Sequence, residues 1–301
     1  MKLKKLFQHP LMIYLYLTAR GLTKIVPDEL HLRFMYRVVL GRKLRLEHPN
    51  TFNEKLQWLK LNDKNPLYTA LVDKILVKEW VKESIGEEFV TPTIEIWDDV
   101  DDIDLKKLPN QFVLKTNHDC GGLAICHDKD SFNFDVAKRK IKKHLNRNYY
   151  WGCREWPYKD VVPKIFAEEY LESDSNLGML DYKFYCFNGE PKFLYVSEGL
   201  DNHETARISF LTMDWKFANF KRADYVGFEN LPNKPQSFSE MIELSKKLSS
   251  GIPFVRVDFF EHNSKPRFSE MTFHPCGGFM PFDPPEWDQK LGSMLDLGQI
   301  K

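Results

Sequence analysis

Two apolar, strand-like segments near the end of the chain each carry one acidic residue. Asp258 lies within residues 254–260 (FVRVDFF) and Glu270 lies within residues 266–273 (PRFSEMTF), with a polar turn between them. Antiparallel strands joined by a short turn can place two such carboxylates on one face and at the same depth. Like charges held side by side repel each other unless a cation lies between them. The pattern therefore predicts an antiparallel sheet with a cation site on one face.

Magnesium together with phosphate groups suits such a site, because Mg²⁺ takes one or two carboxylates and fills its other positions with phosphate oxygens and water. Arg256 lies two residues before Asp258. It is therefore expected on the same face, where it can bind a phosphoryl oxygen through two hydrogen bonds. The alternative is a pair of exposed acids on a hairpin, but the strongly apolar surroundings of both residues favour the metal site.

A lysine and a glycine pair occur together in residues 112–122 (FVLKTNHDCGG). Lys115 lies inside an apolar strand, where an ammonium group needs an anionic partner. Gly121 and Gly122 allow the backbone to approach a ligand closely and to direct N–H groups at phosphate. Taken alone, the segment is explained slightly better by an ordinary strand end and turn.

A third segment combines an apolar strand, residues 165–171 (IFAEEYL), with residues 181–187 (DYKFYCF). The acidic end of the first strand can offer backbone groups to a nucleobase edge and a carboxylate to an amino group or ribose. Lys183 on the second strand can then reach phosphate. Without further context, a plain strand with solvated acids is the better explanation.

The order of the elements predicts an α+β architecture with two sheets. Residues 1–62 show helical patterns only, with Gly41 ending one helix and Thr51 capping the next. Further helices are predicted at residues 66–84, 131–146 and 238–248. Strands are predicted at residues 89–96, 111–116, 161–171, 182–187, 191–197, 254–260 and 266–273, with a hairpin turn at Asn188–Gly189.

Charge and cysteine content restrict the class of protein. The 43 Lys and Arg residues balance 43 Asp and Glu residues, which argues against a protein that binds nucleic acid over its whole surface. The five cysteines show no repeating spacing, so reduced thiols in a cytoplasmic protein are expected. Residues 1–45 carry ten Lys or Arg residues but only two acids. They are explained equally well as a peripheral membrane contact and as a helical layer on the protein.

These segments, with residues 49–59 (PNTFNEKLQWL) and 72–81 (VDKILVKEWV), follow an order that resembles the ATP-grasp superfamily and, within it, the TupA-like family of bacterial surface polysaccharide synthesis. The resemblance implies an ATP-grasp fold in which two α+β lobes sandwich ATP. The implied division is an N-terminal helical segment (1–62), a part containing the small lobe (63–168) and a C-terminal lobe with the metal site (169–301).

The resemblance also implies a role for each site residue. Asp258 and Glu270 would bind Mg²⁺, and Thr272 stands where many ATP-grasp enzymes have an asparagine as a third metal contact. Arg256 and Lys115 would act on the transferred phosphoryl group. The implied ATP contacts are Lys74 and Lys115 on the phosphates, Gly121 and Gly122 in a mobile lid, Glu168, Glu169 and Tyr170 around adenine, and Lys183.

The implied activity is Mg²⁺- and ATP-dependent activation of a carboxylate as an acyl phosphate, followed by attack of an amine. The expected substrates are small molecules: an amine such as an amino acid, and a saccharide-linked carboxylate such as a uronic acid of a surface polysaccharide. The aromatic residues 149–158 (YYWGCREWPY) can bind such a sugar or pack in a core. Alternative functions are a glycosyltransferase that uses the acidic residues 99–104 and a nucleotide-binding scaffold.

Overall fold

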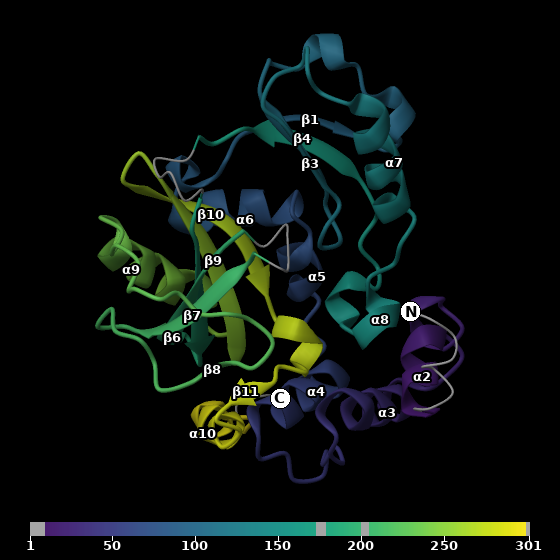
Figure 1. Cartoon of the computed structure of the whole chain (residues 1–301), viewed down its shortest axis with the longest axis vertical. Helices are drawn as coiled ribbons and strands as arrows, with labels where there is room; N and C mark the ends of the chain where they lie inside the picture. The colour runs from purple at the N-terminus through teal and green to yellow at the C-terminus, as the bar shows by residue number, and fades with distance from the viewer. Residues whose placement is uncertain (1–9, 173–178, 200–204, 299–301) are drawn as a thin grey trace.

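The computed structural model describes residues 10–172, 179–199 and 205–298, and its strands form two separate antiparallel sheets with a short two-stranded ribbon. The order of the four-stranded sheet is β1-β4-β2-β3, that of the five-stranded sheet is β10-β9-β5-β6-β7, and the ribbon pairs β11 with β8 (Figure 1). The strands are β1 Thr93–Trp97, β2 Phe112–Thr116, β3 Leu123–Cys126, β4 Ile165–Glu169, β5 Asp181–Phe187, β6 Glu190–Glu198, β7 Arg207–Thr212, β8 Lys221–Arg222, β9 Phe254–His262, β10 Lys265–Thr272 and β11 Phe282–Asp283.

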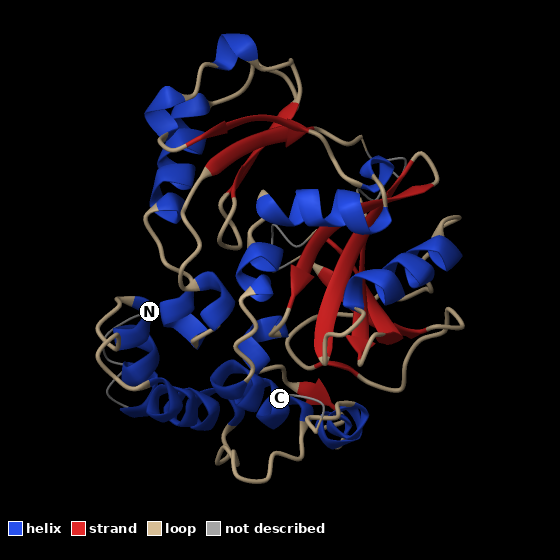
Figure 2. Cartoon of the chain, turned by 180° about the vertical axis from the view of Figure 1, so that it is seen from behind, coloured by secondary structure: helices blue, strands red, loops and turns tan. Residues whose placement is uncertain are grey.

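The helices cover both sheets and form a layer at the N-terminal end (Figures 1 and 2). They are α2 Pro10–Ala19, α3 Asp28–Leu40, α4 Phe52–Asn62, α5 Leu67–Val72, α6 Leu76–Ile85, α7 Phe134–Leu145, α8 Tyr150–Cys153, α9 Phe238–Ser249 and α10 Trp287–Met294. The predicted α+β class with an N-terminal helical segment is confirmed. In the part of the chain that the structure describes, no helix combines the length and apolar character needed to cross a bilayer.

The five-stranded sheet is buried on both faces. One face, which includes Phe184 and Val257, packs with α5, α6 and α9, and Figure 2 shows α6 lying across this sheet. The other face, which includes Tyr185 and Phe254, packs with α4 and α10. Because side chains alternate along a strand, Lys183, Arg256 and Asp258 lie on this second face. The site residues are therefore embedded in an aromatic layer.

Local signals in the sequence are confirmed at several turns and caps. Asn188 and Gly189 both have positive φ angles, 50° and 80°, as a tight hairpin turn requires. Gly41 ends α3 with a φ of 70°. Thr51 caps α4 by accepting a hydrogen bond from the backbone of Glu54, whose side chain accepts one from the Thr51 N–H in return.

The predicted helix over residues 66–84 is divided into α5 and α6, and this break positions Lys74. Asp73 accepts hydrogen bonds from the N–H groups of Ile75 and Leu76 at 2.8 and 3.2 Å. Asn117 donates its side-chain amide to Asp73, and its carbonyl accepts the N–H of Lys74 at 3.0 Å. A contact with a distant loop therefore outweighs the helical pattern.

Two other predictions differ from the structure. The strand predicted over residues 89–96 begins at Thr93, because residues 87–89 form a 3-10 turn. Strands β3 and β7 were not expected, and both are short edge strands of their sheets.

Gly292 of α10 lies against the start of α4, and Gly152 of α8 offers a matched helical control. A Cβ atom on Gly292 would lie 2.2 Å from the Asn50 carbonyl oxygen, whereas one on Gly152 would meet nothing within 4 Å. Gly292→Ala is therefore expected to lower the free energy of unfolding by about 1–3 kcal/mol. Gly152→Ala is expected to be neutral or to stabilise by about 0.4–1 kcal/mol. Urea unfolding of both variants measures the difference, and equal stabilities would contradict the packing.

Candidate active site

The predicted acid pair occupies adjacent strands and shares one arginine. Glu270 on β10 lies directly opposite Asp258 on β9. Arg256 donates from Nε and Nη2 to the two oxygens of Asp258 at 2.7 and 2.6 Å, and Nη2 also reaches Glu270 Oε1 at 3.1 Å. The two carboxylates therefore lie on the same face, held by one guanidinium group.

Lys183 on β5 contributes a second positive charge from the next strand. Its ammonium group donates to Asp258 Oδ2 at 2.7 Å and lies 3.4 Å from Asp181 Oδ1. Burial opposes the charge on Lys183, but Asp181 and Asp258 outweigh it and raise the pKa of the lysine. Burial also raises the pKa of Asp181, while Lys183 acts against this. Asp181 is a site residue that sequence reasoning missed, although it starts the strand that carries Lys183.

Glu270 is the more open of the two acids. The Glu270 side chain keeps 32% of its surface exposed, whereas Asp258 has none. Burial acts to raise the pKa of Glu270, but the charges of Lys183, Lys74 and Arg256 outweigh it and lower the pKa to about 2. Glu270 is therefore ionised throughout the physiological range, and Lys74 is near enough to contribute.

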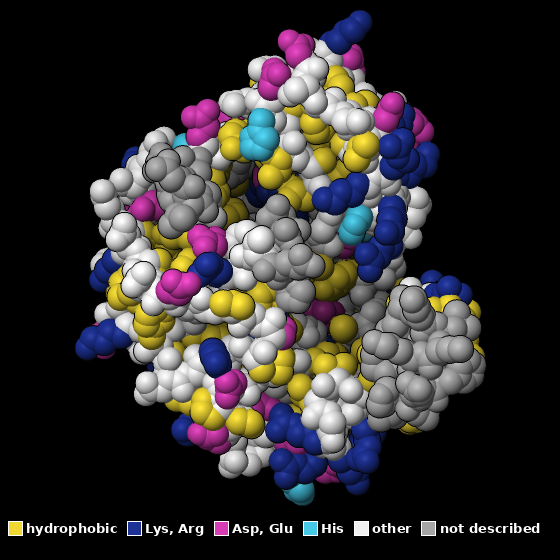
Figure 3. Space-filling view, viewed as in Figure 1, with side chains coloured by type: hydrophobic (Ala, Val, Ile, Leu, Met, Phe, Trp, Pro, Cys, Tyr) yellow, Lys and Arg dark blue, Asp and Glu magenta, His cyan; other side chains and the backbone are white. Residues whose placement is uncertain are grey.

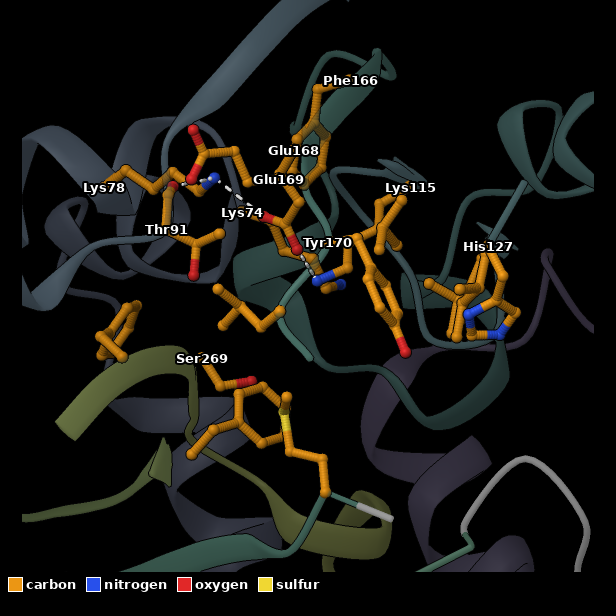
Figure 4. A pocket seen from close by; sticks show the side chains of 17 residues that line it. Lys74, Lys78, Thr91, Lys115, His127, Phe166, Glu168, Glu169, Tyr170 and Ser269 are labelled. Carbon is orange, nitrogen blue, oxygen red and sulfur yellow. Dashed lines mark hydrogen bonds and ion pairs between the residues drawn. The ribbon is translucent and has the colours of Figure 1, made fainter. Parts of the chain in front are cut away.

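A cavity of about 340 Å³ lies between the two sheets, next to this acid pair. Its polar wall contains Lys74, Lys78, Lys115 and Glu168. Its apolar wall includes Val113, Leu123, Ile125, Phe166, Tyr170, Leu171, Met179, Phe260 and Phe268. Figure 4 shows the lysines pointing into the cavity, and Figure 3 shows the surface hollowed between the sheets with hydrophobic side chains around the opening.

Glu168 connects two lysines at the polar wall. Its Oε2 accepts a hydrogen bond from Lys78 at 2.9 Å, and its Oε1 is paired with Lys115 (Figure 4). Lys78 also donates to the Thr91 carbonyl and the Thr93 hydroxyl, both at 2.9 Å. Burial acts to raise the pKa of Glu168, but the two lysines outweigh it and lower the pKa.

The side chain of Glu168 is thus directed at lysines, while Glu169 and Tyr170 also line the cavity. Lys78 is a second residue that sequence reasoning missed. Its signal was present, because it lies four residues after Lys74 within the segment VDKILVKEWV. Only the fold brings it to Glu168, 90 residues away.

The glycine pair lies in a loop that is strongly hydrogen-bonded. Gly122 accepts the N–H of Thr116 at 2.8 Å, and a Cβ on Gly122 would lie 2.0 Å from the Thr116 hydroxyl oxygen. Asp119 binds His144 through its side chain and accepts a hydrogen bond from Lys74 through its carbonyl. The loop therefore lies beside Lys74, and only a glycine fits at Gly122.

The donor set fits a magnesium ion. Asp258 and Glu270 supply carboxylate oxygens, and Thr272 lies two residues after Glu270 on the same face of β10. Among the described residues no group of three or more His, Cys, Asp or Glu side chains is arranged to hold a metal. A cation here would thus depend on ligands from a substrate, which is typical of Mg²⁺ with phosphates.

The acidic residues 99–104 lie away from this site. Asp99 and Asp104 cap 3-10 turns by accepting hydrogen bonds from the N–H groups of Asp101 and Lys106. Asp101 forms ion pairs with Lys138 and Lys142 of α7. None of these acids lines the cavity between the sheets.

The fold thus places lysines on one side of the cavity and an acid pair on the other. The TupA-like ATP-grasp family matches residues 54–296, and the chain therefore belongs to this family. No curated protein matches the sequence.

Solved structures with a similar chain course include ATP-grasp ligases. D-alanine–D-alanine ligase from Bacillus anthracis is 17% identical with a TM-score of 0.36, over 68% of this chain and 57% of that chain. The Helicobacter pylori ligase is 12% identical with a TM-score of 0.42, over 82% and 70%. The ATP-grasp ligase PsnB with Mg and ADP is 11% identical with a TM-score of 0.44, over 94% and 74%. The chain thus spans 57% and 60% of the length of the two Bacillus anthracis structures.

Replacing Lys78 tests the role of the buried ion pair. Lys78→Met removes one of the two lysines that pair with Glu168 among the described residues, and it is expected to lower the free energy of unfolding by about 1–3 kcal/mol. Adding Glu168→Gln should recover most of this loss, because the buried charge is then absent. Lys82→Met, one turn further along α6, removes a partly exposed side chain paired with the exposed Glu79 and should change stability by less than about 0.5 kcal/mol. Equal effects of Lys78→Met and Lys82→Met would contradict the assignment.

Proposed function

We propose that this protein is an ATP-dependent carboxylate–amine ligase that forms an acyl phosphate and then an amide. The observation that carries the proposal is the continuity between the cavity and the acid pair. Ser269 lines the cavity, and Glu270 is the next residue on the same strand. Lys74 lines the cavity and also lowers the pKa of Glu270. A nucleotide in the cavity would thus extend its phosphates toward Asp258 and Glu270.

The proposed roles of the site residues are phosphate binding and charge neutralisation. Lys74 and Lys115 would bind phosphate oxygens at the cavity wall, and Lys183 lies beyond them beside Asp258. Arg256 would bind the phosphoryl group on its way to the carboxylate substrate. Asp258 and Glu270, with Thr272, would hold Mg²⁺, which when bound neutralises phosphate charge. Phosphoryl transfer depends mainly on such positioning and electrostatic stabilisation.

The proposed substrates are an amine, such as an amino acid, and a uronic acid or similar carboxylate linked to a saccharide. The proposed setting is surface polysaccharide synthesis on the cytoplasmic side of the membrane. Family membership supports these substrates, and the aromatic residues 149–158 beside the acid pair support a sugar-sized acceptor. We also retain residues 1–62, 63–168 and 169–301 as the proposed functional division of the chain. No feature of the described site favours the glycosyltransferase alternative.

Nucleotide binding and ADP release test this function. Mg·ATP is expected to raise the melting temperature because it binds the native state only, whereas UDP-sugars should not. ADP release should be stimulated only when a uronic-acid oligosaccharide and amino acids are both present. Glu270→Ala and Lys115→Ala should each abolish this release with the fold intact, while Glu243→Ala, at an exposed position of α9, should not. Near-normal ADP release by Glu270→Ala would contradict the metal assignment.

The N-terminal layer has a surface that fits an anionic bilayer, and we propose that it contacts the membrane. Ile25 and Leu22 are 92% and 63% exposed, and Phe34 of α3 is 45% exposed. Basic residues accompany them, and Figure 3 shows Lys and Arg side chains gathered over α3 and the loop after it. Exposed apolar side chains beside basic ones are typical of interfacial binding.

Liposome sedimentation tests this contact with surface variants. Deleting residues 1–45 would also remove Leu32 and Tyr36, which are buried against Phe279, so point changes are cleaner. Leu22→Ser with Ile25→Ser should reduce pelleting with phosphatidylserine vesicles. Val162→Ser with Val226→Ser removes two side chains that are each 66% exposed elsewhere and should have no effect. Equal pelleting of both double variants would discard the membrane contact.

A further inference from the structure

Glu155 is a buried carboxylate without a matching donor. It lies between α8 and the 3-10 turn Trp156–Tyr158, with 3% of its side chain exposed. Among the described residues, none donates a hydrogen bond to it, and the ion-pair contact that it makes is with His274 Nδ1 at 3.8 Å. That nitrogen also has no hydrogen-bond partner among these residues. Buried carboxylates are ordinarily compensated, so this one is open to a ligand.

Two cations close to Glu155 in the fold or in the sequence, Lys60 and Arg154, are hydrogen-bonded to other groups. Lys60 uses its three protons on neutral oxygens, those of the Gln57 side chain, the Cys153 carbonyl and the Gly277 carbonyl, at 3.0, 2.7 and 2.6 Å. Arg154, the preceding residue, directs its guanidinium group away, to the carbonyls of Trp151, Thr23 and Val26. Both cations therefore fix the surrounding backbone and leave the carboxylate of Glu155 unoccupied.

The surroundings of Glu155 match an ammonium group. Tyr149 and Tyr158 lie beside it with their rings 5.0 Å apart, and the negative charge of Glu155 contributes to raising the pKa of both phenols. A carboxylate combined with aromatic rings is a typical environment for an organic cation. A phosphate or carboxylate ligand would be repelled by the acid.

Glu155 also lies next to the reacting end of the proposed active site. The charge of Arg256 acts on Glu155, and the charge of Glu270 acts on the neighbouring Tyr158. Lys60 joins α4 to the carbonyls of Cys153 and Gly277. The 3-10 turn Pro275–Gly278, which follows β10, is thereby fixed beside the loop that carries Glu155. Glu155 therefore lies near enough to Arg256 for their charges to interact.

We propose that Glu155 binds the ammonium group of the amine substrate and accepts a proton from it before the amide bond forms. This inference rests on the ligase function proposed above. The ammonium group gives one proton to Glu155, and the freed electron pair on nitrogen forms the C–N bond. The bond between the carbonyl carbon and the phosphate oxygen breaks, and the departing phosphate takes a second proton from nitrogen. The products are the amide and hydrogen phosphate, with one proton left on Glu155.

The acidity of Glu155 is suited to this exchange. Burial raises the pKa of Glu155 to about 7, although the charges of Lys60 and Arg256 act in the opposite direction. Such a group accepts and releases a proton readily near neutral pH. The titratable and charged groups around it are Lys60 on α4, Tyr149, Cys153 and Tyr158 around α8, Arg256 on β9, and His274 and Cys276 after β10.

The test compares two nucleophiles in full-length wild-type protein, Glu155→Gln and Glu155→Asp. The acyl phosphate is generated with Mg·ATP and oligogalacturonate and is intercepted either by a mixture of amino acids or by hydroxylamine. Amino acids are protonated at neutral pH and need a base, whereas hydroxylamine is largely unprotonated. Glu155→Gln should lower amide formation by about 10²–10⁴-fold and should keep hydroxamate formation near the wild-type rate. Glu155→Asp, which keeps the charge, should restore part of the amide formation.

The pH profile and a matched control complete the experiment. Wild-type kcat/KM for the amine should show an inflection near pH 7, below which it falls more steeply because Glu155 becomes protonated. Glu155→Gln should lose this inflection and follow only the ionisation of the amine itself. Glu243→Gln on α9 should behave as wild type, and melting temperatures verify that every variant is folded.

The possible results separate this inference from the ligase function. Amide formation by Glu155→Gln at the wild-type rate would overturn the inference, as would an equal loss of amide and hydroxamate in a folded variant. If wild-type protein forms neither product, the ligase function itself is refuted, and the inference falls with it.

Discussion

The complete burial of Asp258 is the constraint on which the site depends. A carboxylate in that position is tolerated only when positive charge and hydrogen bonds compensate it. Arg256 from the same strand and Lys183 from the neighbouring strand supply both, at 2.6–2.7 Å. Arg256 then extends to Glu270 on the other side. The fold of one sheet thus fixes the positions of four charged groups before any ligand binds.

On the other side of the cavity, the four-stranded sheet also contains a buried carboxylate that two cations compensate. Glu168 is buried between Lys78 and Lys115, so the ion pairs hold the direction of Lys115 toward the cavity. Groups whose orientation is already set need no rearrangement when charge moves in a reaction, and this preorganisation is the main source of electrostatic catalysis. The two sheets therefore present fixed charges to each other across a space lined by apolar side chains.

Local patterns in the sequence were sufficient for part of this arrangement. The positions of Asp258 and Glu270 follow from strand alternation and a short turn, and the caps at Thr51 and Gly41 follow from their neighbours. Local patterns could not predict which residues pair with the buried charges. Lys78 and Glu168 are 90 residues apart, and the break at Asp73 depends on Asn117 in a separate loop. Only the assembled fold determines which charges meet.

Within the aromatic residues 149–158, Arg154 connects this segment to the N-terminal layer. Arg154 has a left-handed conformation with φ of 55°, which is strained for a residue with a side chain and is retained only where other contacts enforce it. Its guanidinium group provides these contacts by binding carbonyls of the N-terminal layer. The residue after this turn, Glu155, is buried. The loop between α2 and α3 therefore fixes the conformation of the turn that precedes Glu155.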